Sequence, residues 1–312
     1  MRKGRRTVFS FAGRSNEVVW LLLQGLGFIA ETISHTPFHR YPDRRGVCAK
    51  DEVSEMLAKP KDTRTDSIAI AADASFFSSI GHETHFYLIR HGESEGNAKR
   101  TFQGRLDLPL AERGKEQARA VGAWLADKSI DCLYTSPLLR AAETARIVTQ
   151  ASGPSAQPRC DETFLEMDTG VFSGLGYDEA QNRFPEIFTA FRGQSWEAVP
   201  DAEKAEALYA RAIAAWTLLR ERAVSGGKAL ACISHSGFIQ WMLRATFGCH
   251  AWMPLFSIAN CAVFELVVAP TRSGLAYLQW RNINFQAPLG KTGLAAPRSA
   301  QVDQNDPFQI PR

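Results

Sequence analysis

Between residues 86 and 283, short apolar segments alternate with amphipathic segments, and this alternation limits the fold more than any other feature of the chain. The apolar segments predict strands at Phe86–Ile89, Asp131–Tyr134, Ala229–Ile233, Cys261–Val268 and Gly274–Ile283. The amphipathic segments predict helices at Glu112–Ala126, Arg140–Thr149, Ala202–Ala223 and Ser236–Phe247. Such alternation favours an α/β fold, a three-layer sandwich with a mostly parallel central sheet flanked by helices. The last two strands are expected to form a hairpin near Pro270.

Three of the predicted strands end in polar clusters. Arg90-His91-Gly92 follows the first strand, Ser136 to Arg140 follows the second, and Ser234 to Gly237 follows the third. Because the carboxyl ends of parallel strands lie at one edge of a sheet, residues distant in sequence converge there. Two arginines and two histidines at that edge predict a pocket for a dianion, since a guanidinium forms paired hydrogen bonds with phosphate oxygens. A histidine beside an arginine at a strand end is also placed to attack phosphorus.

Taken together, the three clusters resemble the histidine phosphatase superfamily, the phosphoglycerate-mutase-like enzymes. The resemblance covers about residues 84–285 and implies a phosphoglycerate-mutase-like fold and a phosphohistidine intermediate. It implies that His91 is the nucleophile and that Arg90 and Arg140 flank it. It further implies that His235 is the second histidine of the pocket and contacts the transferred phosphoryl group.

Two further segments extend the resemblance. In the family, the asparagine at the position of Asn97 helps to bind phosphate, and the loop containing Gln103-Gly104 lies at the pocket mouth. The segment Leu165–Gly170 resembles the one that supplies the proton donor, here Glu166. Independently of the family, the backbone amides that open the helix at Ser236 can face an anion. The predicted substrate-binding residues are Arg90, Asn97, Gln103, Gly104, Arg140, His235 and Ser236.

The predicted mechanism follows from what phosphoryl transfer requires, which is mainly positioning and stabilisation of charge. Arg90 and Arg140 disfavour a third cation nearby and should therefore help to keep His91 neutral. Glu166 must hold a proton for the leaving alkoxide and then take one from the attacking water. Because the arginines stabilise the phosphoryl charge, we expect neither a metal site nor a cofactor.

The segment around Glu166 bears on the choice between hydrolysis and mutase activity. Phosphoglycerate mutases that use a bisphosphate cofactor carry Glu-Arg-x-Tyr-Gly followed by Gly-Leu-Asn-Lys. Here Met167, Thr169 and Tyr177 replace the arginine, tyrosine and lysine that hold the substrate's carboxylate and second phosphate. The sequence therefore predicts a metal-independent phosphatase. Two alternatives stay open: a cofactor-dependent phosphoglycerate mutase, and a weakly active regulator that binds phosphoproteins.

The leaving group of the substrate is less constrained, and both a small phosphorylated metabolite and a phosphoprotein fit the prediction. Aromatic residues between Gly170 and Ala202 hint at a non-sugar or mixed surface over the pocket, namely Phe172, Phe188, Phe191 and Trp196. Residues 84–285 carry 21 Lys and Arg against 21 Asp and Glu, so this region has no positive excess that would favour nucleic acid. The sequence does not decide the oligomeric state, and a homodimer stays open.

The flanking segments have a different character, and we predict domain boundaries at 82/83 and 285/286. Residues 1–45 carry eight Lys and Arg against three Asp and Glu, and the run Val18–Ala30 is too short to cross a bilayer comfortably. Residues 1–82 are open to three interpretations: a poorly ordered extension, a targeting segment, or a misassigned start codon. Residues 286–312 are expected to form a flexible tail. The six cysteines contain no C-x-x-C pair, which favours a reducing, cytoplasmic location.

Overall fold

The computed structural model describes residues 71–152, 157–252 and 257–289. The predictions for the run Val18–Ala30 and for the tail beyond residue 289 lie outside the described residues. Within the described ranges, six strands form one sheet in the order β3-β2-β4-β1-β5-β6. Their bounds are β1 Thr84–Arg90, β2 Cys132–Thr135, β3 Arg159–Cys160, β4 Ala229–Ser234, β5 Ala262–Pro270 and β6 Ala276–Gln286.

The centre of the sheet is parallel and one side of it is antiparallel. Strand β4 lies between β1 and β2 and pairs in parallel with both, and β2 also pairs in parallel with β3. Strands β5 and β6 form an antiparallel hairpin that joins the sheet along β1. The predicted α/β class, the mostly parallel centre and the closing hairpin are therefore confirmed.

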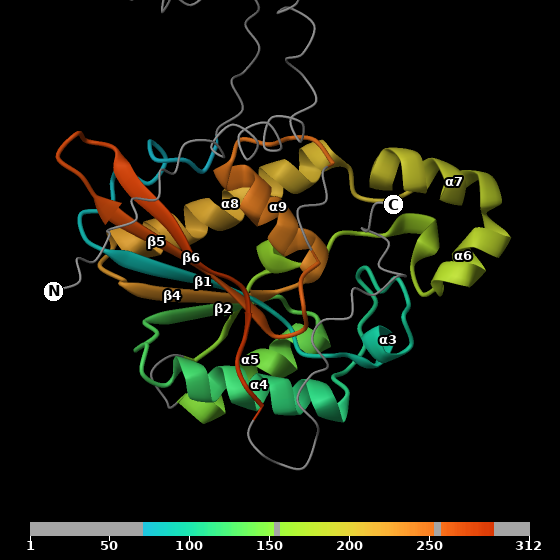
Figure 1. Cartoon of the computed structure of the whole chain (residues 1–312), viewed down its shortest axis with the longest axis horizontal. Coiled ribbons are helices and arrows are strands. Elements are labelled where there is room, and N and C mark those ends of the chain that lie inside the picture. Colours follow the sequence, from blue (N-terminus) through green and yellow to red (C-terminus); the bar gives the residue numbers. More distant parts are fainter. Residues whose placement is uncertain (1–70, 153–156, 253–256, 290–312) are drawn as a thin grey trace, which may run out of the picture. The chain divides into compact units, whose positions relative to one another are not determined.

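Helices cover both faces of the sheet (Figure 1). Helices α8 (Ala205–Val224) and α9 (Ser236–Thr246) lie on one face, and α4 (Glu112–Leu125) and α5 (Leu139–Ser152) lie on the other. Side chains of β1 alternate between two cores: Phe86 and Leu88 pack with the first pair of helices, whereas Tyr87 and Ile89 pack with the second. In the described ranges no helix is long and apolar enough to span a membrane.

The packed region also includes residues on the N-terminal side of the boundary predicted at residue 83. Ala72, Phe76, Phe77 and Ile80 are buried in the core on the α8 and α9 side of the sheet. The ring of Phe77 lies 5.4 Å from that of Trp216, centroid to centroid, in an edge-to-face arrangement. The sequence did not indicate this packing, because residues 1–82 lack a sustained hydrophobic period.

The stretch between β3 and α8 contains short helical elements that periodicity did not predict. They are the 3-10 helices η1 (Glu162–Phe164), η2 (Gly170–Phe172) and η3 (Ser195–Ala198), the helices α6 (Tyr177–Arg183) and α7 (Pro185–Gln194), and, earlier in the chain, the single-turn helix α3 (Glu95–Ala98). Helices α6 and α7 lie beyond the strand ends, on the side where α3 also lies (Figure 1). Such short helices carry too few turns to display a clear period of 3.6 residues.

Candidate active site

A cavity of about 690 Å³ opens at the carboxyl end of the central strands. Of the predicted site residues, those that line it are Arg90, His91, Asn97, Gln103, Gly104, Arg140, Glu166 and Ser236. These residues come from strand ends and loops that are distant in sequence, as the parallel topology predicts. His235 is fully buried and does not line the cavity, but its ring packs against that of His91, with 5.0 Å between the centroids.

His91 follows directly after β1 and is held in one orientation. Its backbone N–H donates to the carbonyl oxygen of Ser234 at 2.9 Å, which ties the residue to the end of β4. In the side chain, Nδ1 lies 2.6 Å from the carbonyl oxygen of Gly92. A carbonyl oxygen can only accept, so Nδ1 carries the proton and Nε2 carries the lone pair. The imidazole therefore presents a nucleophilic nitrogen at Nε2.

The loop after His91 approaches helix α4 so closely that only glycine fits at two positions. A Cβ atom on Gly92 would collide with the carbonyl oxygen of Gly114, and a Cβ atom on Gly114 would collide with that of Glu93. The N–H of Gly92 also donates to Oγ1 of Thr144 on α5 at 3.1 Å. These contacts fix the carbonyl group that orients the imidazole of His91.

His235 contacts a serine that sequence reasoning placed in a polar cluster without a role. Its Nε2 lies 2.8 Å from Oγ of Ser136, which follows β2 and is fully buried. Oγ of Ser136 also accepts a hydrogen bond from the backbone N–H of Leu138 at 3.3 Å. The second ring nitrogen of His235, Nδ1, is buried and has no hydrogen-bond partner within the described ranges. A buried ring nitrogen of this kind is suited to bind a ligand atom.

Both histidines are neutral at physiological pH. Burial lowers the pKa of His91 well below its ordinary value, and the nearby Arg140 and Arg90 lower it further. Burial likewise lowers the pKa of His235, with additional contributions from Arg140, His91 and Arg90. The expectation that the two arginines help to keep His91 unprotonated is therefore confirmed, although desolvation is the larger cause.

Arg140 lies at the start of α5 and is only 1% exposed. Its Nη1 donates to the carbonyl oxygen of Leu106 at 2.6 Å, and its Nη2 donates to that of Gly104 at 2.8 Å. Burial lowers the pKa of Arg140 to about 10, while nearby Glu166 opposes this effect. The guanidinium therefore stays charged at neutral pH and faces the cavity in a fixed plane.

The loop at residues 103–107 lines the cavity and also supplies the hydrogen-bond acceptors that orient Arg140. Gly104 has a φ of 50°, a left-handed conformation that favours glycine, and this turn directs its carbonyl group towards Arg140. Leu106 supplies the second acceptor through its backbone, which a reading of side-chain types could not identify. The Oε1 atom of Gln103 lies 2.7 Å from Oγ of Ser94, so this glutamine also holds the loop in place.

Arg90 and Asn97 are oriented by a segment that the sequence did not single out, residues 257–260. Nη1 of Arg90 donates to the carbonyl oxygen of Ile258. Oδ1 of Asn97 accepts from the backbone N–H of Ser94 at 3.1 Å and from Nδ2 of Asn260 at 3.1 Å. Because Oδ1 is occupied in this way, the amide group Nδ2 of Asn97 is the side available to an anion in the cavity.

Glu166 lies against the N-terminus of α9. Its Oε1 accepts from the backbone N–H groups of Met167 at 2.8 Å and Phe238 at 2.9 Å, and its Oε2 accepts from that of Gly237 at 3.1 Å. Each carboxylate oxygen has two lone pairs, so Oε1 is saturated whereas Oε2 retains one. A proton on this carboxyl group therefore belongs on Oε2. A Cβ atom on Gly237 would lie 2.6 Å from Oε1, so a larger residue there would displace the carboxylate of Glu166 from this position.

The aromatic residues expected over the pocket lie mostly in the core behind it. Phe172, Phe188, Phe191 and Trp196 are each at most 4% exposed, and of these only Trp196 reaches the cavity lining. The expected surface of exposed aromatic side chains is therefore wrong for three of the four. They interact with one another through ring contacts, such as 4.8 Å between the centroids of Phe191 and Trp196.

Comparison with known families matches residues 86–282, more than half of the chain, to the family described as Histidine phosphatase superfamily (branch 1). A 2,3-bisphosphoglycerate-dependent phosphoglycerate mutase of Sinorhizobium fredii is 40% identical over 116 residues, which cover 36% of this chain and 55% of that protein. Phosphoserine phosphatase 1 of Hydrogenobacter thermophilus is 37% identical over 101 residues, which cover 32% of this chain and 47% of that protein. The chain thus spans about half the length of these curated relatives.

Solved structures support the fold. The phosphoglycerate mutase from Bacillus anthracis superposes with a TM-score of 0.56 at 22% identity, covering 66% of this chain and 95% of that one. Bacillus stearothermophilus YhfR superposes with a TM-score of 0.54 at 27% identity, covering 64% of this chain and 96% of that one. The predicted phosphoglycerate-mutase-like architecture is confirmed by these similarities.

Proposed function

Because the chain belongs to the histidine phosphatase superfamily, we propose that it hydrolyses phosphomonoesters through a phosphohistidine formed on His91. One observation carries the proposal. The Nδ1–H of His91 is bound by the carbonyl group of Gly92, which leaves Nε2 as a neutral nucleophile beside two arginines. A histidine with a purely structural role would normally use both ring nitrogens in hydrogen bonds, whereas Nε2 of His91 keeps its lone pair beside the cavity.

In the first step, the Nε2 lone pair of His91 attacks phosphorus and the ester P–O bond breaks. Oε2 of Glu166 gives its proton to the leaving oxygen, so the product is a neutral alcohol and the carboxylate is left ionised. In the second step, water attacks the phosphohistidine and Glu166 takes the proton of that water. The N–P bond breaks, its electron pair returns to Nε2, and inorganic phosphate leaves.

The remaining residues stabilise the phosphoryl group during transfer. Arg90 and Arg140 supply positive charge, and Arg140 is preorganised because two backbone carbonyls already fix its guanidinium plane. Asn97 offers its Nδ2 group, and Ser236 lines the cavity as the first residue of α9, where the positive end of the helix dipole favours an anion. Nδ1 of His235 is buried and has no hydrogen-bond partner among the described residues, and donation from it to a phosphate oxygen would satisfy it.

Three uncharged side chains favour hydrolysis over phosphoryl shuttling. Met167, Thr169 and Tyr177 occupy the positions where bisphosphate-dependent mutases place the groups that hold the carboxylate and second phosphate. All three line the cavity, so a bound substrate finds no positive charge at these positions to bind its carboxylate or second phosphate. A bisphosphoglycerate is then held too weakly to be retained between the two half-reactions, and water completes the cycle.

Mutase activity is the second candidate, because Lys99 and Arg100 line the same cavity and could bind a second anionic group. The two activities are separated by assaying phosphoglycerate interconversion with and without a bisphosphate primer. Primer-dependent interconversion faster than release of inorganic phosphate would establish the mutase and reject hydrolysis as the main reaction.

Turnover of p-nitrophenyl phosphate in the presence of EDTA tests the proposal itself. We expect release of inorganic phosphate without added metal, and a phosphorylated His91 after rapid quenching at alkaline pH, where phosphohistidine is stable. Absence of both turnover and phosphohistidine would favour the third alternative, a regulator that binds phosphoproteins without processing them.

The expected substrate is a small phosphorylated metabolite or a phosphoprotein. A cytoplasmic location and the domain limits at residues 83–285 stay predictions, and the oligomeric state stays open. A screen of phosphorylated metabolites and phosphopeptides with the full chain would identify the substrate class, and sedimentation would report the oligomeric state.

A further inference from the structure

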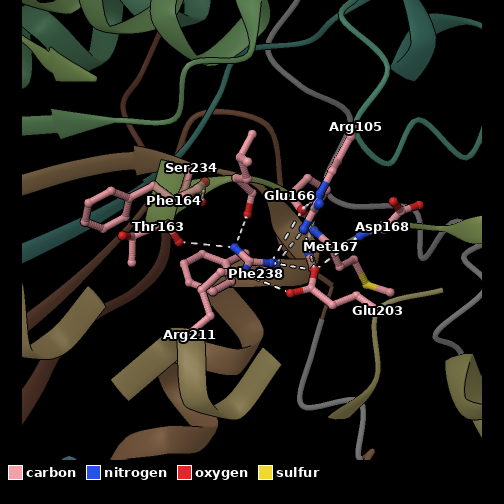
Figure 2. Close-up of polar contacts among 12 residues, drawn as sticks. Arg105, Thr163, Phe164, Glu166, Met167, Asp168, Glu203, Arg211, Ser234 and Phe238 are labelled. Carbon is pink, nitrogen blue, oxygen red and sulfur yellow. Dashed lines mark hydrogen bonds and ion pairs between the residues drawn. The ribbon is translucent and has the colours of Figure 1, made fainter. Parts of the chain in front are cut away.

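Arg211, on helix α8, contacts the backbone segment that carries Glu166 (Figure 2). Its Nη1 donates to the carbonyl oxygen of Thr163 at 3.1 Å and to that of Leu165 at 2.6 Å. Its Nη2 lies 3.5 Å from the carbonyl oxygen of Glu166 itself. A single guanidinium therefore binds three carbonyl groups in the segment that ends at the proposed proton donor.

Glu203 fixes the plane of that guanidinium. Its Oε1 accepts from Nε of Arg211 at 2.9 Å, and its Oε2 accepts from Nη2 at 2.7 Å (Figure 2). The two side chains are 12% and 16% exposed, so water competes little with this paired interaction. The guanidinium carbon also lies 4.0 Å from the ring centroid of Phe238, whose own N–H binds the carboxylate of Glu166. Arg211 thus contacts both the backbone of Glu166 and a residue that holds its side chain.

The same glutamate connects the proton donor to the loop that orients Arg140. Oε2 of Glu203 accepts from the backbone N–H of Asp168 at 3.3 Å and from Nη2 of Arg105 at 3.2 Å. Nε of Arg105 donates to the carbonyl oxygen of Glu166 at 3.4 Å. Arg105 follows Gly104, the residue whose carbonyl group is bound by Arg140. The segments around residues 104 and 166 are therefore fixed relative to each other by one carboxylate.

We propose that Arg211, held by Glu203, is a positioning residue for proton transfer by Glu166. The inference rests on the proposed function, because Glu166 delivers a proton only if a phosphoester is cleaved. Arg211 is not among the residues that line the cavity, so it acts through Glu166 and not on the substrate. Displacing a reacting group by about 1 Å can lower a rate about 100-fold.

The role of Arg211 can be tested by comparing substrates whose leaving groups differ in basicity, because only a strongly basic leaving group depends on proton transfer from Glu166. An alkoxide is a strong base and must receive a proton as it departs, whereas nitrophenolate is a weak base and departs without one. Loss of proton transfer therefore slows cleavage of an alkyl phosphate far more than cleavage of p-nitrophenyl phosphate. A general loss of folded structure would slow both reactions by the same factor.

The experiment compares kcat/KM for glycerol phosphate and p-nitrophenyl phosphate in four variants of the full chain. Arg211→Lys keeps the charge but loses the fork that binds Glu203 and the carbonyl groups. Glu166→Gln removes the proposed proton donor completely, so its loss of kcat/KM is the largest that mispositioning of Glu166 can cause. Arg220→Lys is the matched control on the same helix, since Arg220 also binds a backbone carbonyl and an aromatic ring, both of Phe76. Glu203→Gln is the second test variant if Arg211→Lys does not fold.

We expect Arg211→Lys to lose about 10- to 100-fold in kcat/KM for glycerol phosphate and less than about threefold for p-nitrophenyl phosphate. Glu166→Gln should show the same selectivity to a larger degree, and Arg220→Lys should match the wild type. With the aryl substrate, Arg211→Lys should also accumulate more phosphohistidine during turnover, because Glu166 must deprotonate the attacking water.

Equal loss on both substrates in Arg211→Lys, or in Glu203→Gln if the former does not fold, would overturn the inference. So would wild-type activity towards glycerol phosphate in both variants. In these cases a wild-type enzyme that still turns over and forms phosphohistidine leaves the proposed function intact. Absence of turnover and phosphohistidine in the wild type would instead remove the proposed function, and this inference with it.

Discussion

The two walls of the cavity are built in different ways. The phosphate wall, which we define as Arg90, His91 and Arg140 together with His235 behind them, consists of polar side chains, three of which are at most 2% exposed. Backbone carbonyl groups orient these side chains: that of Gly92 binds His91, and those of Gly104 and Leu106 bind Arg140. Burying a charge is costly unless its hydrogen bonds are made, so each of these positions requires a specific geometry.

Another part of the cavity is supported by an aromatic cluster, which we define as Phe102, Phe172, Tyr177, Phe188, Phe191 and Trp196, and of which Phe102, Tyr177 and Trp196 reach the lining. Its members contact one another ring to ring, with 5.6 Å between the centroids of Phe102 and Phe172 and 4.6 Å between those of Tyr177 and Phe188. Apolar packing depends on volume and contact more than on direction, so it tolerates exchange of one large residue for another. Under the proposed function, we expect the phosphate wall to set the chemistry and the aromatic side of the cavity to influence the choice of leaving group.

The largest expected effect is that of His91→Ala, which removes the nucleophile from the phosphate wall. We expect a loss of about 10⁴-fold or more in kcat, since no other group in the cavity forms the covalent intermediate. The measurement is release of inorganic phosphate, with circular dichroism as the check that the chain still folds. Wild-type turnover by a folded His91→Ala variant would disprove the nucleophile assignment.

Arg140→Lys should reduce kcat/KM about 100-fold, because the fork that fixes the guanidinium between two carbonyl groups and the phosphate is lost. Arg146→Lys, on the same helix, is the matched control, since Arg146 is exposed and its hydrogen bond within the described part of the chain is to Gln150. An equal effect of the two substitutions would mean that Arg140 contributes charge alone and that its fixed geometry is unimportant.

On the aromatic side, Tyr177→Ala should raise KM about tenfold for a substrate with a large apolar leaving group while leaving kcat nearly unchanged. Tyr177 lines the cavity and packs edge to face on Phe188, so the substitution removes surface next to the leaving group. Inhibition by inorganic phosphate should not change. A parallel loss of phosphate affinity would show that the two walls do not act separately.

The smallest expected effect concerns stability at acidic pH. The pKa values of His91 and His235 are lowered in the folded protein, so the unfolded chain binds more protons as the pH falls below the ordinary histidine pKa. The stability that these groups contribute is therefore present above pH ~6.5 and is lost as the pH falls below it. Denaturant unfolding between pH 7.5 and 5.5 should show a decrease of about 1 kcal/mol for each histidine.

His91→Ala provides the control for that titration. It should flatten the decrease by about the share of one histidine, because alanine binds no proton in either state. An identical pH dependence in the variant and the wild type would contradict the assignment of a lowered pKa to His91.

Most of the phosphate wall could be predicted from sequence, because each member directly ends a strand or begins the helix that follows. The chain from Phe86 to His91 shows an apolar strand that stops at two polar residues, and this local pattern survives in the structure. The same holds for Ser234, which ends β4, and for His235, which follows it. Neighbours in sequence stay neighbours in space, and the topology of a parallel sheet then gathers the strand ends at one edge.

The groups that orient these side chains were not predictable in the same way. Asn260 and Ile258 reach Asn97 and Arg90 only because β5 pairs antiparallel with β1, across more than 160 residues of chain. Backbone acceptors such as the carbonyl groups of Gly104 and Leu106 cannot be recognised from the sequence, because every residue type carries a carbonyl group. The aromatic residues of the 170–198 segment were expected over the pocket, yet most of them are buried in the hydrophobic core of the protein. In such short helices, periodicity cannot separate a buried face from one that faces a substrate.

The sequence alone determined the α/β class, the parallel centre of the sheet and the identity of the polar residues at its edge, because hydrophobic period and strand-end chemistry are local properties. The three-dimensional structure was needed to establish which nitrogen of His91 is free, that Glu166 lies against the N-terminus of α9, and that Arg211 and Glu203 contact its backbone segment. Those features depend on hydrogen bonds between segments far apart in the chain, whose directions are set by packing and not by residue type.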